Sequence, residues 1–358
     1  MEAYNVLGLM SGTSLDGLDL ALCRFECGQT WRFDILGAET APYDASMRKM
    51  LQEAFFGSAI DLLRADHALG EWIGSRVEEF CAHYLPVPDL LVSHGHTVFH
   101  QPAGGITCQI GNGWRITARS GLPLVSDLRS LDVVLGGQGA PLVPMGDRHL
   151  FSEYDVCLNL GGFSNISFDD ISGRRVAFDV CPVNFVLNRL AARLGEPYDD
   201  GGSMARSGRP PAGLIDRLDR LSYYSAEPPK SLGQEWVDAE VMPLLDGLER
   251  AEDLMAAFTI HVAGQLDRAI RHTAIDRGAE CTVLVTGGGA YNRYLMEMAS
   301  EMGAGTIRYV LPEPRIIDYK EALIFAFLGL LKWRGEVNTL RSVTGARSDS
   351  SGGAIYRL

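Results

Sequence analysis

A stretch near the start of the chain is rich in glycines and hydroxyl side chains, the residue types that hold phosphate groups. Residues 8–19 read GLMSGTSLDGLD and lie between two strand-like apolar runs. Glycines let backbone N–H groups approach an anion, and serine and threonine hydroxyls add further donors. The sequence therefore predicts a β-hairpin whose tip holds phosphates, with an ordinary polar turn as the alternative. The pattern GxxxxGK[ST] is missing, which excludes a Walker-type loop.

Two further glycine-rich junctions follow along the chain. Residues 158–166, LNLGGFSNI, repeat the plan of a strand, a small-residue tip and a second strand. In residues 284–292, LVTGGGAYN, a strand, three glycines and the start of a predicted helix follow one another, as they do around bound nucleotides. A tight structural turn would explain the third junction equally well. Together, the two hairpins predict a clamp for a polyphosphate.

Asp179 is the carboxylate most suited to acid–base chemistry. It follows the predicted strand 175–178 and precedes a predicted helix that has Pro182 in its first turn. In open α/β sheets, ligands bind at the carboxyl ends of the strands, so Asp179 is expected at a ligand-binding edge. A helix-capping carboxylate is the alternative.

Three histidines, His94, His96 and His100, lie close together after the predicted buried strand 89–92. His94 and His96 would share one side of a continuing strand, as metal ligands do. No carboxylate or cysteine is near enough in the sequence to complete a metal site. A polar loop that faces a substrate is therefore favoured over a metal site or a purely structural role.

Composition narrows the class of protein. A chain of 358 residues predicts two domains, and a net charge of −13 without a basic block argues against nucleic acid as a partner. The seven cysteines form no CxxC pair and no zinc spacing, which suits a reducing cytoplasm. No signal peptide and no apolar span of transmembrane length appears, so a membrane partner is not expected.

The elements that must position these residues are predicted as an alternation of strands and helices. Residues 107–111 and 114–118 are expected to form a further hairpin. The run at 136–141, GGQGAP, has the composition of a linker. We therefore expect a first lobe over residues 1–135 and a second over 136–339, with the tail at 340–358 a candidate to return to the first lobe.

The order of the three junctions is similar to that of the actin, hexokinase and Hsp70 superfamily. More closely, the chain resembles the anhydro-N-acetylmuramic acid kinase family over nearly its whole length. The matching stretches are GLMSGTSLDGLD at 8–19, SHGHTVFHQP at 93–102, GGQGAPLVP at 136–144, LNLGGFSNI at 158–166, FDVCPVN at 178–184, PPKSLG at 228–233, VTGGGAYN at 285–292 and SVTGA at 342–346.

The resemblance implies a two-lobed α/β fold of the actin-like, ribonuclease H-like kind with a central cleft. It also implies an ATP-dependent enzyme of cell-wall recycling with a small amino-sugar substrate. Such enzymes open the ring of 1,6-anhydro-N-acetylmuramic acid with water and phosphorylate O6. A homodimer is kept as the candidate assembly.

The resemblance assigns Asp179 as the general base and Asp16 or Asp19 as the ligand of Mg²⁺. The residues expected to bind the nucleotide are Gly12, Thr13, Ser14, Leu15, Asp16, Gly17, Leu18, Asp19, Gly161, Gly162, Gly287, Gly288, Gly289 and Asn292. The residues expected to bind the sugar are His94, Arg129, Asn184, Lys230 and Glu321.

The chain departs from the family pattern at two motifs. Where the commoner form reads DTGPGN, this chain has Cys181 and Val183 in place of two glycines, and where it reads SHGQT, this chain has His96. A plain sugar 6-kinase without ring opening shares every nucleotide motif. An actin-like ATPase that acts in binding or assembly shares the fold, so both stay as alternatives.

Overall fold

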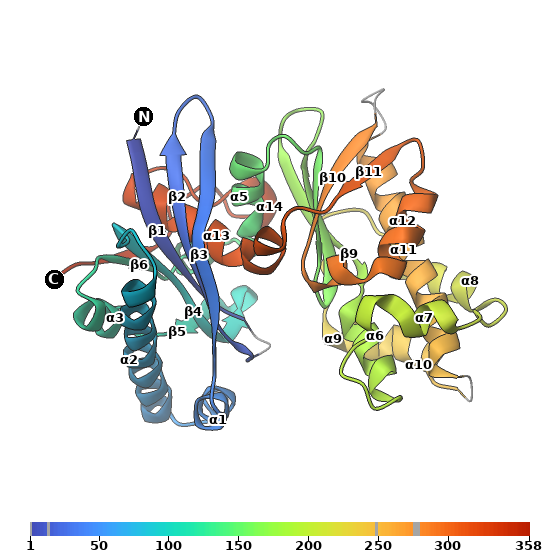
Figure 1. The fold of residues 1–358 in the computed structure, drawn as a ribbon, viewed down its shortest axis with the longest axis horizontal. Helices are drawn as coiled ribbons and strands as arrows, with labels where there is room; N and C mark the ends of the chain where they lie inside the picture. The colour runs from blue at the N-terminus through green and yellow to red at the C-terminus, as the bar shows by residue number, and fades with distance from the viewer. Residues whose placement is uncertain (1, 13–14, 248–249, 275–279) are drawn as a thin grey trace. The chain divides into compact units, whose positions relative to one another are not determined.

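The computed structural model describes residues 2–12, 15–247, 250–274 and 280–358, and its chain forms two compact units. The first unit comprises Met1–Leu150 and Tyr319–Leu358, and the second comprises Phe151–Asp318 (Figure 1). The expected boundary at 135/136 therefore differs from the division at 150/151. The helix that starts before residue 319 and the tail both return to the first unit.

The first unit is built on a mixed sheet with the strand order β12–β6–β4–β1–β2–β3, and β5 pairs with β4. Its strands are β1 (Glu2–Ser11), β2 (Gly17–Cys27), β3 (Trp31–Pro42), β4 (Leu90–Gln101), β5 (Ile106–Ile110), β6 (Leu124–Ser126) and β12 (Ala354–Tyr356). Its helices are α1 (Ala45–Glu53), α2 (Ala59–His83), α3 (Gly113–Ser120), α4 (Ser130–Val134), α5 (Val143–Leu150), α13 (Pro314–Trp333), of which the unit holds the part from Tyr319, and α14 (Arg341–Thr344).

Alternation along β1 explains how helices cover both faces of this sheet. Leu7 and Leu9 are fully buried in a cluster that includes the apolar stripe of α2. The neighbouring Gly8 faces α13, where a Cβ atom on it would overlap the carbonyl oxygen of Ala322. Because successive side chains of a strand point to opposite faces, β1 is held between α2 and α13. The end of β1 is thereby fixed in position.

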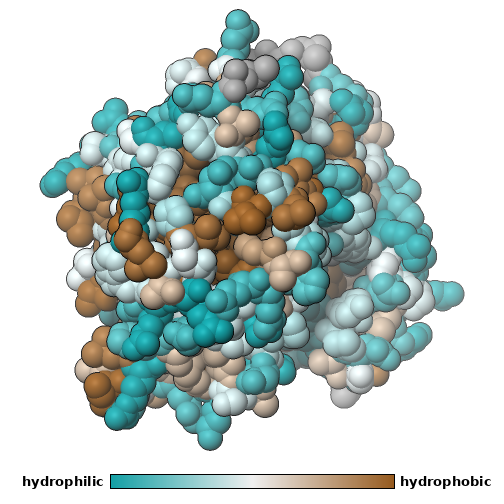
Figure 2. Space-filling view, turned by 60° about the vertical axis from the view of Figure 1, so that its left-hand side comes forward, coloured by the Kyte–Doolittle hydropathy of each residue, from teal (hydrophilic) through white to brown (hydrophobic). Residues whose placement is uncertain are grey.

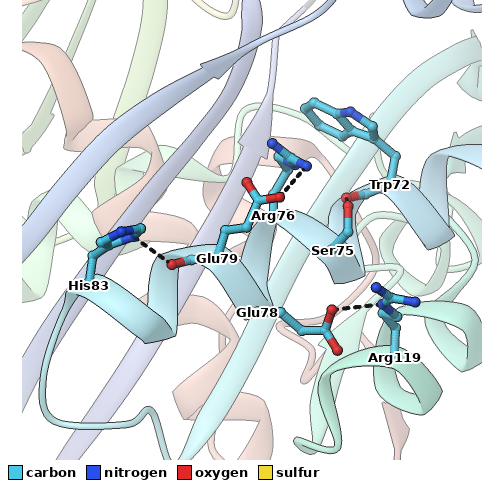
Figure 3. Close-up of polar contacts among 7 residues, drawn as sticks. All are labelled: Trp72, Ser75, Arg76, Glu78, Glu79, His83 and Arg119. Atoms are coloured by element: carbon cyan, nitrogen blue, oxygen red, sulfur yellow. Dashed lines mark hydrogen bonds and ion pairs between the residues drawn. The ribbon is translucent and has the colours of Figure 1, made fainter.

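The outer face of α2 carries a network of polar contacts (Figure 3). Arg119 of α3 donates its Nε to Glu78 at 2.8 Å, and the backbone oxygen of Glu79 lies 2.9 Å from Nδ1 of His83. The helix begins at a capping box between Ser58 and Asp61. In the view of Figure 2, apolar side chains form separate groups among hydrophilic ones.

The second unit has the strand order β11–β10–β7–β8–β9. Its strands are β7 (Val156–Leu160), β8 (Phe163–Asp169), β9 (Arg175–Pro182), β10 (Cys281–Thr286) and β11 (Ile307–Val310). Its helices are α6 (Asn184–Ala192), α7 (Ser203–Ser207), α8 (Leu214–Asp219), α9 (Gln234–Trp236), α10 (Met242–Leu245), α11 (Ala251–Ala274) and α12 (Arg293–Met302), with 3₁₀-helices η2 (Asp200–Gly202), η3 (Ser222–Ser225) and η5 (Gly288–Tyr291) and a π-helical turn η4 (Val237–Val241).

The two sheets share one topology. In each, the first three strands are antiparallel neighbours, and the first strand then pairs in parallel with the fourth. Beyond that strand, β6 in the first unit and β11 in the second add in parallel. This repeated order confirms the expected α/β class. Among the described residues, no helix combines the length and apolarity needed to cross a membrane.

Two local predictions from the sequence are wrong. Residues 107–111 do form a strand, but its partner is β4, and residues 113–120 form α3, which Asn112 caps by accepting the N–H of Arg115 at 3.2 Å. Asp179 lies within β9 and not after its last residue, because the strand continues to Pro182. Pro182 accordingly ends a strand and does not begin a helix.

Candidate active site

The tip of the first hairpin connects β1 and β2, whose last pair is Ser11 with Leu18. Thr13 and Ser14 lie outside the described residues. Leu15 has a φ of 60°, a left-handed conformation that is rare for a side chain of this size. The exposed Asp16 uses its backbone oxygen to accept the N–H of Tyr43 at 3.2 Å. The hairpin predicted from the sequence is confirmed, and Leu15 holds a strained backbone conformation just before β2.

A buried hydroxyl network supports the base of this hairpin. The hydroxyl of Tyr43 donates to Ser11 Oγ at 2.8 Å, and Ser11 Oγ lies 3.1 Å from Nδ1 of His96. Because Ser11 accepts from Tyr43, its own proton is available for His96 Nδ1. Burial raises the pKa of Tyr43 to about 12, which keeps its donor proton in place, and lowers the pKa of His96. This contact favours a neutral His96 and helps to hold Ser11, at the base of the hairpin, in position.

Asp19 is the hairpin carboxylate with a fixed orientation. It accepts the hydroxyl of Thr40 at 2.6 Å through Oδ1. Mg²⁺ prefers oxygen ligands and keeps several waters, so one or two carboxylates at such a tip fit it chemically. Among the described residues, no group of three or more potential metal ligands occurs. Asp16 and Asp19 are thus the candidates, and no larger protein cage accompanies them in the described part of the chain.

His94 and Arg129 form a second polar centre in the first unit. Arg129 donates its Nε to Nε2 of His94 at 2.8 Å and one terminal nitrogen to the backbone oxygen of Gly139 at 2.7 Å. Nδ1 of His94 lies 2.9 Å from the oxygen of Gly95. The accepting Nε2 must lack a proton, so His94 is neutral with its proton on Nδ1. Burial, and then the charge of Arg129, lowers the pKa of His94 to about 3.

A buried carboxylate holds the loop that orients Arg129. Asp132 is 1% exposed, and its oxygens accept the N–H of Gly139 at 2.8 Å and the hydroxyl of Thr344 at 2.7 Å. The GGQGAP run is therefore an ordered part of the first unit. Its contacts explain why the SVTGA motif of the tail, which contains Thr344, belongs with it.

Glu321 lies early in α13 and interacts electrostatically with both Arg129 and Asp19. Desolvation raises the pKa of its carboxyl group, and the charge of Arg129 opposes that rise. Solvent also reaches this side chain, which weakens the interaction. Four of the predicted residues of the first unit, Asp19, His94, Arg129 and Glu321, are thus linked directly or electrostatically.

In the second unit, the second predicted hairpin is confirmed by the antiparallel pairing of β7 with β8. The backbone oxygen of Gly161 accepts the N–H of Asn184, and the oxygen of Gly162 accepts that of Phe185. Asn184 also donates its side-chain amide to Leu160 at 3.3 Å. The start of α6 is therefore bonded to the hairpin tip. A Cβ on Gly162 would meet no atom closer than 3.7 Å, which leaves room for a ligand to approach.

The third glycine junction has a mixed role. A Cβ on Gly287 or Gly289 would crowd Leu160, so these glycines are needed for packing against β7. Around Gly288, the nearest atom would be 3.8 Å away, and a ligand can approach there. Asn292 caps α12 by accepting the N–H of Leu295 at 3.0 Å. Asn292 therefore has a structural role at the start of α12, and its contact with a nucleotide stays a prediction.

Asp179 stands next to a β-bulge. The pairing of β8 with β9 shifts between Ser164 and Asn165, so that Ser164 faces Cys181 and Asn165 faces Asp179. Ser164 Oγ bridges the N–H and the oxygen of Cys181 at 3.1 and 2.9 Å. Bulges reorient side chains near functional sites. Burial raises the pKa of Asp179, and a hydrogen bond from the N–H of Leu232 to Oδ2, at 2.8 Å, acts against that rise.

Lys230 is held by its own unit. Its Nζ donates to the backbone oxygen of Tyr223 at 3.2 Å and lies 4.7 Å from the centroid of the Tyr223 ring. Desolvation lowers its pKa. These contacts give Lys230 a structural role beside Asp179, and its contact with the sugar stays a prediction.

Sequence reasoning missed several residues that support these groups. Tyr223 and Leu232 bind Asp179, and Asp132 and Thr344 hold the loop at Gly139. The motifs PPKSLG and SVTGA marked the right segments. No spacing pattern indicated which of their atoms make the contacts.

The two units share one sheet order, and each has a hairpin with a glycine-containing tip between its first two strands, an arrangement typical of the actin-like fold. A family model described as anhydro-N-acetylmuramic acid kinase matches residues 4–358.

Curated relatives carry the same description. One from Salinibacter ruber is 34% identical over 98% of this chain and 95% of its own length. One from Paramagnetospirillum magneticum is 34% identical over 97% and 98%, and one from Pseudomonas putida is 33% identical over 98% of both chains. The chain belongs to the anhydro-N-acetylmuramic acid kinase family.

Proposed function

We propose that this protein opens the ring of 1,6-anhydro-N-acetylmuramic acid with water and transfers the γ-phosphoryl group of ATP to O6. The products are N-acetylmuramic acid 6-phosphate and ADP. Family membership supports the substrate and the kinase reaction. We further expect the enzyme to act in the cytoplasm, in recycling of the cell wall, and to form a homodimer.

The arrangement of Asp179 is the observation that carries the ring-opening step. Its Oδ2 accepts the N–H of Leu232, which leaves Oδ1 to accept a proton from water. The water oxygen then bonds to the anomeric carbon, and the bond from that carbon to O6 breaks. O6 takes the phosphoryl group, so no separate acid is needed to protonate the leaving oxygen. One carboxylate thus does the work that a glycosidase divides between two.

The nucleotide is assigned to the glycine-containing turns. We propose that the first hairpin, from Gly12 to Asp19, and the second, at Gly161 and Gly162, hold the phosphates through backbone N–H groups. In the second hairpin the donor is Gly162, because the N–H of Gly161 already donates to the oxygen of Phe163 at 3.2 Å. Gly288 would lie against the nucleoside, where the structure leaves space next to its Cα. Mg²⁺, held by Asp16 or Asp19, would supply charge neutralisation during phosphoryl transfer.

The sugar is assigned to polar groups that are already oriented. Arg129 is fixed by His94 and Gly139, and it retains donors for a carboxylate such as the lactyl group. Asn184, Lys230 and Glu321 are proposed as further contacts with hydroxyl and amide groups. Partial burial of Arg129 strengthens such contacts because water competes less well there.

Dependence of ATP turnover on the sugar tests this function. Purified protein should release ADP rapidly with ATP, Mg²⁺ and the anhydro-sugar, and slowly when the sugar is left out. N-acetylglucosamine serves as the control sugar, since it lacks the anhydro bridge and the lactyl group. ADP release that is equally fast without any sugar would contradict a metabolite kinase and favour an actin-like ATPase.

A further inference from the structure

The segment of residues 223–232, here called the clamp segment, makes three hydrogen bonds to Asp179. Lys230 accepts the N–H of Asp179 through its backbone oxygen at 3.2 Å. Leu232 donates its N–H to Oδ2 at 2.8 Å. The Tyr223 hydroxyl donates to the backbone oxygen of Asp179 at 2.6 Å. Both backbone groups and one carboxylate oxygen of Asp179 are thus bound by one stretch of chain.

Tyr223 is the side chain that closes this set of bonds. Its hydroxyl binds Asp179, while its own backbone oxygen accepts Nζ of Lys230 at 3.2 Å. Its ring packs against Trp236 with the centroids 5.3 Å apart. Desolvation raises the pKa of Tyr223 far above neutrality, so the hydroxyl keeps its proton and stays a donor. The two ends of the clamp segment are therefore tied to the same residue of β9.

We propose that Tyr223 is a positioning residue that sets the orientation and the basicity of Asp179 through the clamp segment. This inference deepens the proposed function, on which it rests for the role of Asp179 as the base. Loss of the Tyr223 hydroxyl frees one end of the segment. The N–H of Leu232 then binds Oδ2 less well. A carboxylate that loses a hydrogen bond to its charged form becomes easier to protonate.

The other titratable groups around Asp179 do not mask a change in its pKa when the Tyr223 hydroxyl is removed. Cys181, two residues further along β9, has a pKa raised to about 12 by burial and stays a thiol at neutral pH. Lys230 keeps its contact with Tyr223 through the backbone oxygen, which a phenylalanine retains. Replacing Tyr223 by phenylalanine therefore changes one hydroxyl and no charge near Asp179.

Tyr224 offers a matched control. Its hydroxyl lies 3.0 Å from Nε2 of His261, whose Nδ1 in turn lies 2.5 Å from Asp219. Tyr224→Phe deletes the same atom from the next residue and removes a partly buried hydrogen bond. It leaves all three bonds of the clamp segment to Asp179 in place. A general loss of packing would affect both variants, whereas the proposed role belongs to Tyr223 alone.

The experiment measures the pKa of Asp179 in the ligand-free enzyme by NMR of ¹³Cγ-labelled aspartate. Asp179→Asn identifies the resonance by its absence. Tyr223→Phe should raise the pKa of Asp179 by about one unit, and Tyr224→Phe should leave it unchanged. In turnover assays, Tyr223→Phe should lower kcat about tenfold with little change in KM, and its activity should fall off at a higher pH as the solution is acidified.

An unchanged pKa of Asp179 in Tyr223→Phe, or equal shifts in both tyrosine variants, would overturn the proposal. If Tyr223→Phe fails to fold, Leu232→Pro, which removes the donor N–H itself, must give the same rise. A normal pKa in that variant would equally overturn it. The titration needs no substrate, so a failure of the proposed sugar chemistry would appear as missing turnover in the unaltered enzyme and not as a missing shift.

Discussion

Asp179 is the residue on which the proposed chemistry depends most. Replacing it by asparagine keeps the shape of the side chain and removes the base. We expect Asp179→Asn to lower turnover by about 10²–10⁴-fold, the usual contribution of general acid–base catalysis. ATP affinity should stay within a few-fold of the original, as measured by calorimetry. Near-normal turnover would show that another group takes the proton from water.

The same carboxylate sets a direction for the pH dependence. A base must be ionised to accept a proton, so activity should fall as the pH drops through the pKa of Asp179. Burial places that pKa above the ordinary value of 3.8. The acid limb of the kcat profile should therefore lie at a higher pH than a solvent-exposed aspartate would give. A profile without an acid limb down to pH 4 would contradict this assignment.

Arg129 carries a prediction about substrate affinity. Its planar side chain binds His94 and Gly139 at once, which a lysine cannot reproduce. Arg129→Lys should raise the KM for the sugar about tenfold or more, the range expected when a charged hydrogen bond is lost. The KM for ATP should change little. An unaltered sugar KM would remove Arg129 from the proposed site.

For single residues, the sequence predicts those with distinctive chemistry and misses the residues that hydrogen-bond to them. Asp179 and His94 were identified within motifs, and Arg129 was named among the residues expected to bind the sugar. The hydrogen bonds from Tyr223 and Leu232 to Asp179 join residues 44 and 53 positions apart, and no periodicity signals such contacts. They follow from how β9 and the clamp segment pack together.

Phosphate binding is tested most clearly by a substitution in the first hairpin, between β1 and β2. A branched side chain at Gly12 would occupy the space that a phosphate oxygen needs. Gly12→Val should abolish measurable ATP binding in calorimetry while circular dichroism stays unchanged. Gly104→Val is the control, since no atom lies within 4 Å of a Cβ there. Unchanged ATP affinity in Gly12→Val would refute the role of the hairpin tip.

The contact between β1 and α13 gives a prediction about stability. A methyl group at Gly8 would overlap the backbone oxygen of Ala322, which cannot move without shifting the helix. Gly8→Ala should lower the free energy of unfolding by about 1–3 kcal/mol, the usual effect of overpacking. Denaturant unfolding measures this value, with Gly104→Ala as the control. A stability equal to that of the control would mean that α13 adjusts freely.

Prediction of the elements succeeded where the apolar pattern was long. The strand-like apolar runs on either side of the first glycine-rich stretch were recognised, and they are β1 and β2. Prediction failed at residues 113–120, because so short a segment shows little periodicity. There the cap at Asn112 stabilises a helix. In β9, the pairing with β8 resumes after the bulge, where Ser164 pairs with Cys181. The strand therefore continues beyond Asp179.

For the whole molecule, the chain returns to its first unit after the second is complete. The strand β12 pairs with β6, and Thr344 binds Asp132. The sequence predicted two domains but placed the change of unit too early, because the glycines at 136–141 have the composition of a linker. Their contacts with Asp132 and Arg129, 7 and 10 positions away, depend on the folded shape of the loop, which composition does not reveal.

In the proposed reaction, solvent water opens the anhydro ring and O6 is phosphorylated in the same turnover. Mass spectrometry of the sugar product formed in ¹⁸O-water tests this most directly. We expect one solvent oxygen in N-acetylmuramic acid 6-phosphate, bound at the anomeric carbon when the product is quenched before exchange. A phosphorylated sugar without solvent oxygen, or one that keeps its anhydro ring, would show that water does not open the ring in this reaction.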